Sequence, residues 1–439
     1  MSQQKALKLV LETFPLGRTP FRSFDPFLFC VHHDDAYPGA NPAFRNTTHA
    51  AGTDAPQHLD GVGEHISKEE HRSMGPDPKL LRGRDMGSDF SYDDGWSMYH
   101  GQTVPGFPSH PHRGFETITI VRRGFVDHCD SLGCTARYSR GDTQWLTAGR
   151  GIQHTEMFPL LAYDKTENMD GGAIEGPEAA ADAAVNPLEL FQIWLNLPKK
   201  SKMCEPYFSM FWREDQPVAV LPDLSGATGR TAEVQVVAGA LGEVQPLAPP
   251  PDSWASNGTN NVAVWLLRLP AGVTVELPAA LTAAAAAAAS RGANPLSRAF
   301  YFVKGSDIFL RGGEADEKEV PIHVRTGVRV DPAVALRVRA AADGGDAIVL
   351  MLQGAAIGEP VAQHGPFVMN TREEIMQCFA DYQKTEFGGW PWPTSDYCHA
   401  RSRGRHALHA GARLEYPPAD NKNKGGDASG HRTNKTEKS

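Results

Sequence analysis

The sequence lacks the features that define several large protein classes. No stretch of this chain approaches the ~18 consecutive apolar residues of a membrane span. The N-terminal residues contain no apolar core with a small-residue cleavage site, so we expect no secretory signal. The six cysteines include no Cys-x-x-Cys pair, and scattered cysteines indicate free thiols in a reducing compartment. We therefore expect a soluble cytoplasmic or nuclear protein without a membrane partner.

An excess of positive charge is also absent. The chain has 43 Lys and Arg against 52 Asp and Glu, for a net charge of −9. Direct nucleic-acid binding is therefore not expected, since it usually needs a basic surface. With 439 residues, of which 41% are hydrophobic, the chain is long enough for two domains that each bury a core. We expect the protein to be a monomer.

The chain does contain abundant β-type sequence, in two successive blocks. In the first block, GFETITIVRRGFVDHCD alternates and is rich in β-branched residues. Polar stretches at 40–95 and 160–187 interrupt this block, and we interpret them as a surface insertion and a loop. Two β blocks without β-α-β alternation predict an all-β protein of two barrels or sandwiches, over residues 1–222 and 232–398.

One short helix and a disordered tail complete the prediction. The segment NTREEIMQCFADYQK predicts a helix, because Asn370 or Thr371 can cap it and its apolar residues fall at helical spacing. Residues 399–439 are polar and basic, which predicts disorder. The RSRGR cluster in this tail is interpreted as solvated, with a weak nuclear-import or nucleic-acid patch as the alternative. The alanine tract at 283–289 is interpreted as a low-complexity loop insertion.

Two short couplets carry the most specific chemical signal. They are His110-Pro111-His112 and His154-Thr155-Glu156, about forty residues apart. Positions i and i+2 of a strand point to the same side, so each couplet can direct two donors at one point. Three imidazoles and one carboxylate suit a first-row transition metal and can leave coordination positions open. The couplets therefore predict an open non-haem metal site in the first barrel.

The other histidines give weaker signals. His49, His58, His65 and His71 have polar neighbours and irregular spacing, so we interpret them as solvated. The second block contains no His-x-His or His-x-Glu, and its isolated His323 and His364 are interpreted as structural. We therefore predict one barrel with a metal and one without. The donor set would accept iron, manganese, nickel, copper or zinc.

Other residues near the couplets have two possible roles each. Glu116 stands four residues after His112, so on a regular strand it would face the same side, as a ligand or as a group behind the ligands. Gln144 and Trp145 could border the pocket or belong to the core. Arg113 and Arg150 flank the couplets and could attract an anion or form surface ion pairs.

The sequence resembles the pirin family, whose members are bicupins of the cupin superfamily. The resemblance rests on HPHRGFETITIV, GDTQWLTAGRGIQHTEM, LFQIWLNLP, GPFVMNTREEI and FGGWPWP, and it covers most of residues 8–31, 88–222 and 260–395. It implies two tandem cupin barrels of the jelly-roll type, of which the N-terminal one binds one Fe2+ through His110, His112, His154 and Glu156. It further implies that Glu116 is not a ligand and that the C-terminal cupin lacks a metal.

The resemblance leaves the function open between two main hypotheses. One is a dioxygenase of the quercetin 2,3-dioxygenase type that acts on a small aromatic substrate and O2, with Glu156 or Glu116 as proton acceptor. The alternative is a non-enzymatic nuclear co-regulator whose binding to a transcription factor depends on the redox state of iron. A third hypothesis is a stress-response metalloprotein with a structural ion. Fold and metal by themselves do not decide among them.

Overall fold

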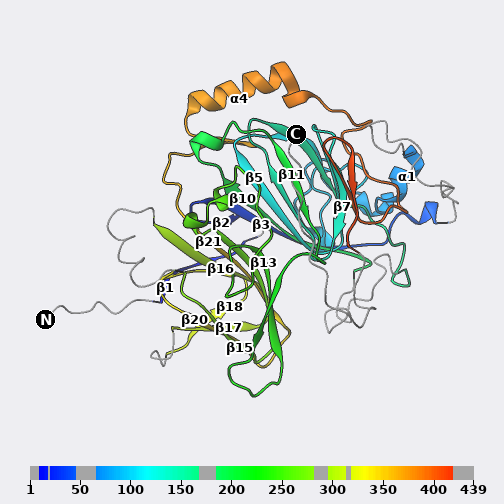
Figure 1. Ribbon diagram of the computed structural model, residues 1–439. Coiled ribbons are helices and arrows are strands. Elements are labelled where there is room, and N and C mark those ends of the chain that lie inside the picture. Colours follow the sequence, from blue (N-terminus) through cyan, green and yellow to red (C-terminus); the bar gives the residue numbers. More distant parts are fainter. Residues whose placement is uncertain are drawn as a thin grey trace, which may run out of the picture.

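The computed structural model of the chain describes residues 9–17, 20–45, 66–167, 184–280, 295–312 and 318–418. These residues form two β-barrels of the jelly-roll type, packed against each other through their larger sheets (Figure 1). The predicted all-β class with two tandem cupin barrels is confirmed. Residues 46–65, with His49, His58 and His65, the alanine tract and residues 419–439 lie outside the described residues.

The N-terminal barrel consists of two six-stranded sheets. The larger sheet has the order β11-β8-β5-β10-β3-β2 and the smaller one β25-β24-β7-β6-β9-β4. The strands are β2 (Phe21–Arg22), β3 (Phe27–Tyr37), β4 (Gly106–His112), β5 (Phe115–Arg123), β6 (Phe125–Asp130), β7 (Thr135–Ser139), β8 (Thr143–Thr147), β9 (Ile152–Met157), β10 (Asn186–Asn196), β11 (Tyr207–Phe211), β24 (His406–His409) and β25 (Arg413–Glu415).

The C-terminal barrel has a larger sheet of order β1-β19-β16-β21-β14-β13-β12 and a smaller one of order β15-β20-β17-β18. Its strands are β1 (Val10–Pro15), β12 (Val218–Pro222), β13 (Thr231–Ala238), β14 (Ala263–Leu269), β15 (Thr274–Leu277), β16 (Leu296–Lys304), β17 (Asp307–Gly312), β18 (Val320–His323), β19 (Thr326–Val330), β20 (Leu336–Ala340) and β21 (Ala347–Ala355). A separate hairpin pairs β22 (Ala362–His364) with β23 (Phe367–Met369).

Alternation along the larger sheets explains how one strand serves two cores. On β5, Ile118 and Ile120 belong to an apolar cluster that also contains Tyr301 and Leu350 of the C-terminal barrel. The intervening Thr119 reaches Glu156 inside the N-terminal barrel, and Val121, which follows Ile120, packs in the same interior. Because successive side chains point to opposite faces, each larger sheet contributes to its own barrel and to the contact between barrels.

Helices are short in the described residues. The predicted C-terminal helix is confirmed as α4 (Arg372–Thr385), which starts with a capping box between Thr371 and Glu374. Figure 1 shows α4 lying along the N-terminal barrel, where Asp381 accepts a hydrogen bond of 2.6 Å from Arg113. The remaining helical elements are α1 (Lys68–Ser73), η1 (Pro42–Phe44), η2 (Pro78–Leu81), η3 (Asp93–Gly95), η4 (Lys199–Ser201), η5 (Trp254–Ser256), η6 (Gly258–Asn260) and η7 (Glu386–Gly388).

Strand pairing crosses the predicted domain boundaries in two places. β1, which the sequence placed in the first domain, pairs with β19 of the C-terminal barrel. β12 also belongs to that barrel, through its pairing with β13. The boundaries were wrong there because position along the chain does not reveal on which sheet a terminal strand finds an open edge.

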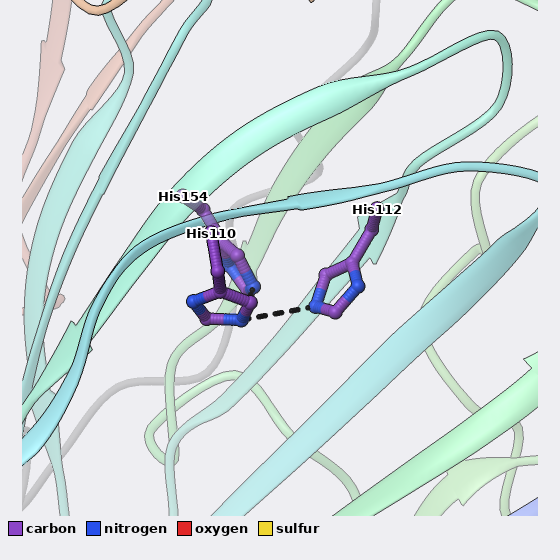
Figure 2. Close-up of side chains that lie close together, drawn as sticks. All are labelled: His110, His112 and His154. Atoms are coloured by element: carbon purple, nitrogen blue, oxygen red, sulfur yellow. Dashed lines mark hydrogen bonds between the residues drawn. The ribbon is translucent and has the colours of Figure 1, made fainter. Parts of the chain in front are cut away.

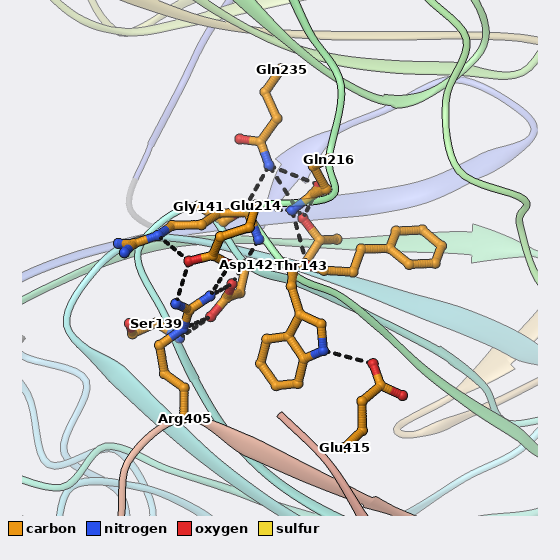
Figure 3. A network of polar contacts seen from close by, with 12 residues as sticks. Ser139, Gly141, Asp142, Thr143, Glu214, Gln216, Gln235, Arg405 and Glu415 are labelled. Carbon is orange, nitrogen blue, oxygen red and sulfur yellow. Dashed lines mark hydrogen bonds and ion pairs between the residues drawn. The ribbon is translucent and has the colours of Figure 1, made fainter. Parts of the chain in front are cut away.

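The prediction of a disordered tail from residue 399 is wrong for residues 399–418. β24 pairs with β7 of the N-terminal barrel, and Trp212 donates a hydrogen bond of 2.7 Å to Glu415 (Figure 3). Arg405, part of the supposedly solvated RSRGR cluster, pairs with the buried carboxylate of Asp142 and with Glu214 at 2.7 Å. A buried carboxylate needs a charged partner, and sequence composition could not show that these arginines supply it.

In the part of the chain that the structure describes, no helix combines the length and the apolar character needed to cross a bilayer.

Candidate metal centre

The two predicted couplets lie side by side on paired strands of the smaller N-terminal sheet. β4 runs antiparallel to β9, with His110 directly opposite His154. A β-bulge between Phe107 and His110 shifts the register of β4. Such a bulge changes the direction of the following side chains. The pairing therefore brings together residues that are 44 positions apart.

The three histidine side chains converge on one point (Figure 2). The Nε2 atom of His110 lies 3.1 Å from Nε2 of His112 and 3.1 Å from Nε2 of His154. One potential ligand atom from each ring lies within 4.8 Å of the others. Three nitrogen atoms facing each other at this spacing are a favourable arrangement for a single cation.

Burial keeps these imidazoles neutral. It lowers the pKa of His110 to about 4 and the pKa values of His112 and His154 well below the usual range. Nδ1 of His110 lies 2.9 Å from the carbonyl oxygen of Pro108, which favours the tautomer with the proton on Nδ1. Nε2 of His110 then offers a lone pair to the shared point, as a metal ligand must.

Glu156 lies beside the histidines and is held by a side-chain amide. Its Oε2 lies 3.9 Å from Nε2 of His154. The Nε2 group of Gln192 lies 2.7 Å from both carboxylate oxygens, and Thr119 donates a hydrogen bond of 3.4 Å to Oε1. Burial raises the pKa of Glu156, and the hydrogen bond from Gln192 works against that rise. A nearby cation would favour the ionised form further.

The donor set therefore fits a transition metal. Three neutral imidazoles and one carboxylate have a net charge of −1. With a divalent ion bound, the ion and its four ligands together would have a net charge of +1. His110, His112 and Glu156 line a cavity of about 1040 Å³, whose walls include the aromatic side chains of Phe29, Phe107 and Trp194. An ion at the convergence point would be accessible from this cavity, and the volume is at the upper end of small-molecule sites.

Glu116 lies elsewhere. It is fully buried and accepts hydrogen bonds from Thr147 at 2.7 Å and from Ser253 of the C-terminal half at 2.5 Å. Its expected position facing the histidines is wrong, because the chain passes from the smaller to the larger sheet between His112 and Glu116. Gly114, with a φ of 88°, lies in this crossing. Spacing along one regular strand therefore does not apply.

The remaining sequence candidates are placed outside the cavity lining. Trp145 is fully buried in the cluster between the barrels, and Gln144 is buried beside it on β8. Arg113 pairs with Asp381 of α4, and Arg150 forms an exposed ion pair of 2.9 Å with Glu205. His71 lies 3.0 Å from the carbonyl oxygen of Asp396, away from the metal centre. Arg113, Arg150 and His71 thus connect parts of the fold.

Two features of the centre were missed by sequence reasoning. Gln192 stands alone in LFQIWLNLP, and only the pairing of β10 with β5 places it against Glu156. The supposed surface insertion at 40–95 also contributes to the cavity wall, through Phe90 and Tyr92, and Ser97 and Tyr99 follow directly after it. A signal for the second feature existed: the stretch SYDDGWSMYH combines aromatic and small polar residues, which is unusual for a solvated loop.

Comparisons with known proteins agree with this architecture. A family profile described as Pirin matches residues 70–195, and one described as Pirin C-terminal cupin domain matches residues 267–388. A Pseudomonas aeruginosa protein named "Putative quercetin 2,3-dioxygenase" is 32% identical over 64% of this chain and 79% of its own length. A Caulobacter vibrioides "Pirin-like protein" is 32% identical over 64% of this chain and 80% of its own.

More distant similarities extend to animals and to solved structures. The Homo sapiens protein named "Pirin" is 28% identical over 66% of this chain and 80% of its own length. A crystal structure of quercetin 2,3-dioxygenase from Acinetobacter baumannii aligns with a TM-score of 0.51 at 20% identity, covering 88% of this chain and 99% of that one. At this identity the structural alignment supports the fold alone.

Proposed function

Because the chain belongs to the pirin family, we propose that it is an iron-binding dioxygenase of the quercetin 2,3-dioxygenase type that acts on a flavonol or a similar aromatic substrate. The observation that carries the proposal is the position of the three-histidine cluster and Glu156 at the wall of a cavity of about 1040 Å³. The names of relatives such as the Pseudomonas aeruginosa protein support the same reaction class.

We assign His110, His112, His154 and Glu156 as the ligands of one Fe2+ ion. Such an ion would supply Lewis acidity and an attachment point for the oxygen atoms of the substrate and for O2. The protein keeps the three imidazoles neutral by burial and holds the Glu156 carboxylate through Gln192. Trp194 donates a hydrogen bond of 3.3 Å to Oε1 of Gln192, which fixes the orientation of the amide.

Aromatic side chains make the cavity suitable for a flat molecule. Trp194 stacks on Phe115 with ring centroids 3.9 Å apart and contacts Phe29 at 4.2 Å. On another wall Phe107 stacks on Tyr99 at 5.1 Å. Rings that are already packed against each other lose little conformational freedom on binding, so they suit a planar aromatic ligand. They also limit the water that can reach the reacting atoms.

The alternative function, a redox-dependent co-regulator, is less well supported by the surface around the site. It requires exposed groups next to the ion that respond to a change in its charge. The two arginines that flank the couplets form ion pairs with other parts of the protein, Arg113 with Asp381 and Arg150 with Glu205. A small aromatic substrate fits the aromatic lining of the cavity, whereas the regulatory function gives the cavity no occupant.

The test is turnover of quercetin by protein reconstituted with ferrous iron without oxygen. Oxygen consumption and carbon monoxide release are then followed after oxygen is admitted, with metal content measured on the same sample. We expect turnover in the wild type, none in His110→Ala, and wild-type turnover in His323→Ala, which removes an exposed histidine of the C-terminal barrel. A full metal site without turnover would overturn the enzyme proposal in favour of the regulatory one. Full metal content in His110→Ala would overturn the ligand assignment.

A further inference from the structure

A second couplet lies on β3, facing the same cavity. His33 and Asp35 are two positions apart, so their side chains point to the same face of the strand. His33 lines the cavity together with the predicted metal ligands His110 and His112. Asp35 lies two residues after His33 on the strand and is 1% exposed. Tyr99, from the segment that covers this end of β3, also lines the cavity.

The three side chains form a continuous chain of hydrogen bonds. The Tyr99 hydroxyl donates to Oδ2 of Asp35 at 2.8 Å, and Nδ1 of His33 lies 2.7 Å from the same hydroxyl oxygen. A hydroxyl has one proton, and here it goes to the carboxylate. Nδ1 of His33 must therefore carry a hydrogen and donate to Tyr99. This leaves Nε2 of His33 as a proton acceptor, and no described side chain forms a hydrogen bond with it.

The surroundings of Asp35 contain no basic partner among the described residues. The backbone N–H of Ser97 donates to its Oδ1 at 3.0 Å, and Tyr99 is the only other donor to this carboxylate in the part of the chain that the structure describes. The titratable groups that interact with it are Asp34, Tyr37, Asp89 and Tyr99, with His33 beyond Tyr99. Arg84 is engaged by Asp89 at 2.9 Å. Burial accordingly raises the pKa of Asp35 to about 7.

We propose that His33, Tyr99 and Asp35 form a proton relay that removes the proton from an acidic aromatic hydroxyl bound in the cavity. The substrate O–H bond breaks and its proton bonds to Nε2 of His33. The Nδ1 proton of His33 passes to the Tyr99 oxygen, and the Tyr99 proton passes to Asp35. His33 changes tautomer, Tyr99 is regenerated, and Asp35 becomes a carboxylic acid. This inference rests on the proposed function, since it assigns the proton acceptor of that reaction.

The relay conserves charge inside the cavity. One buried anion, the Asp35 carboxylate, is neutralised while another, the substrate oxyanion, forms. Creating an additional buried charge would be far more costly. Burial, together with neighbouring His32, lowers the pKa of His33 to about 3, so this ring does not accumulate as a cation. In the relay the His33 ring accepts one proton as it gives up another, so it does not need to become a stable cation.

The competing explanation is that these contacts only fix the covering segment. Tyr99 has a φ of 56°, a left-handed backbone conformation that bulky residues rarely adopt. Two backbone hydrogen bonds of 2.9 Å with Asp89 hold it there. Tyr37 offers a matched control, because its hydroxyl donates to the carbonyl oxygen of Ser97 at 2.7 Å. It fixes the same segment without being part of the relay.

The experiment uses the full-length protein loaded with Zn2+, with 4-nitrocatechol as the probe. The visible absorption of this phenol reports its ionisation, and zinc excludes redox chemistry. We expect Tyr99→Phe to raise the pH midpoint for ionisation of the bound probe by about one unit. Tyr37→Phe should leave that midpoint at the wild-type value. Equal midpoints in Tyr99→Phe and wild type would overturn the relay, as would failure of the probe to bind to the wild type.

Kinetics with quercetin give an independent measurement. Because Asp35 must be ionised to accept a proton, kcat of the iron-loaded wild type should rise with pH through about 7. Tyr99→Phe should lower kcat about 100-fold with little change in KM. His33→Gln tests the same step from the substrate side if Tyr99→Phe does not fold. Wild-type kcat in these variants would overturn the relay and leave the proposed function intact. If ionisation of the probe depends on Tyr99 but quercetin is not turned over, the result would support the relay and overturn the proposal that quercetin is a substrate.

Discussion

The two barrels share one strand plan but fill their interiors in opposite ways. In the N-terminal barrel the pair β4–β9 places His110 opposite His154. By sheet order, the corresponding pair in the C-terminal barrel is β15–β20, where Val275 lies opposite Val338 and Leu277 opposite Leu336. All four of these apolar side chains belong to one buried cluster. Where the first barrel has donors and a cavity, the second has a close-packed core.

This difference shows which part of a cupin barrel maintains the fold and which part is free to change. Both larger sheets direct apolar side chains such as Ile118 and Leu350 into a common core between the barrels. Because that core is shared, the N-terminal interior can hold polar groups and a large cavity without losing its main apolar contact. The C-terminal barrel supplies a rigid base for the metal centre, and it contributes Ser253 to the hydrogen bonds of the buried Glu116.

The largest effect should come from opening a cavity in the C-terminal core. Phe302 is fully buried there, and Phe302→Ala should destabilise the protein by about 3–5 kcal/mol. Denaturant unfolding measures this loss. Metal content per folded molecule should stay at the wild-type value, because the change is remote from the histidines. Loss of metal at full folding would show that the two interiors are coupled.

Removal of the metal should destabilise the N-terminal barrel and leave the C-terminal barrel unaffected. Hydrogen exchange after chelation should increase in β4 and β9, which carry the proposed ligands, and stay constant in β15 and β20. An ion present at one hundred times its Kd stabilises the folded state by about 2.7 kcal/mol. Uniformly increased exchange over both strand pairs would contradict a local role for the ion.

Loss of the Gln192 side chain should weaken metal binding less than loss of a ligand would, but by a measurable amount. Gln192→Leu removes the donor that contacts both oxygens of Glu156, and metal affinity should fall about 10–100-fold. Competition with a chromophoric chelator measures this affinity. Gln353→Leu, on the corresponding strand β21 of the C-terminal barrel, is the control and should bind metal normally. An unchanged affinity in Gln192→Leu would mean that Glu156 needs no orienting partner.

The smallest effect on the metal centre is expected at Glu116, between the barrels. Burial raises the pKa of its carboxyl from the ordinary value of 4.5 to about 7. Between these values the folded state binds more protons than the unfolded one, so stability should decrease as pH rises from about 4.5 to 7. Glu116→Gln should flatten this part of the stability curve and leave metal content unchanged. A loss of metal would instead place Glu116 in the centre.

The sequence predictions were correct where a feature depends on residues close together in the chain, and wrong where it depends on contacts between distant residues. The helix at 372–385 was predictable because its capping box lies within four consecutive residues, Thr371 to Glu374. The histidine couplets were recognisable because a two-residue strand period is local. Glu116 was misplaced because the chain changes sheets between it and His112. The tail was misjudged because Arg405 finds Asp142 more than 260 positions away.

The sequence by itself determined the fold class, the two β blocks and the identity of the groups that can bind a metal, since these depend on residue type and short-range periodicity. Only the tertiary structure decided which groups meet. Strand register sets His110 opposite His154. The folding of 89–99 over β3 joins Tyr99 to His33 and Asp35. Contacts between distant segments depend on sheet pairing and burial, and no local pattern in the chain encodes their partners.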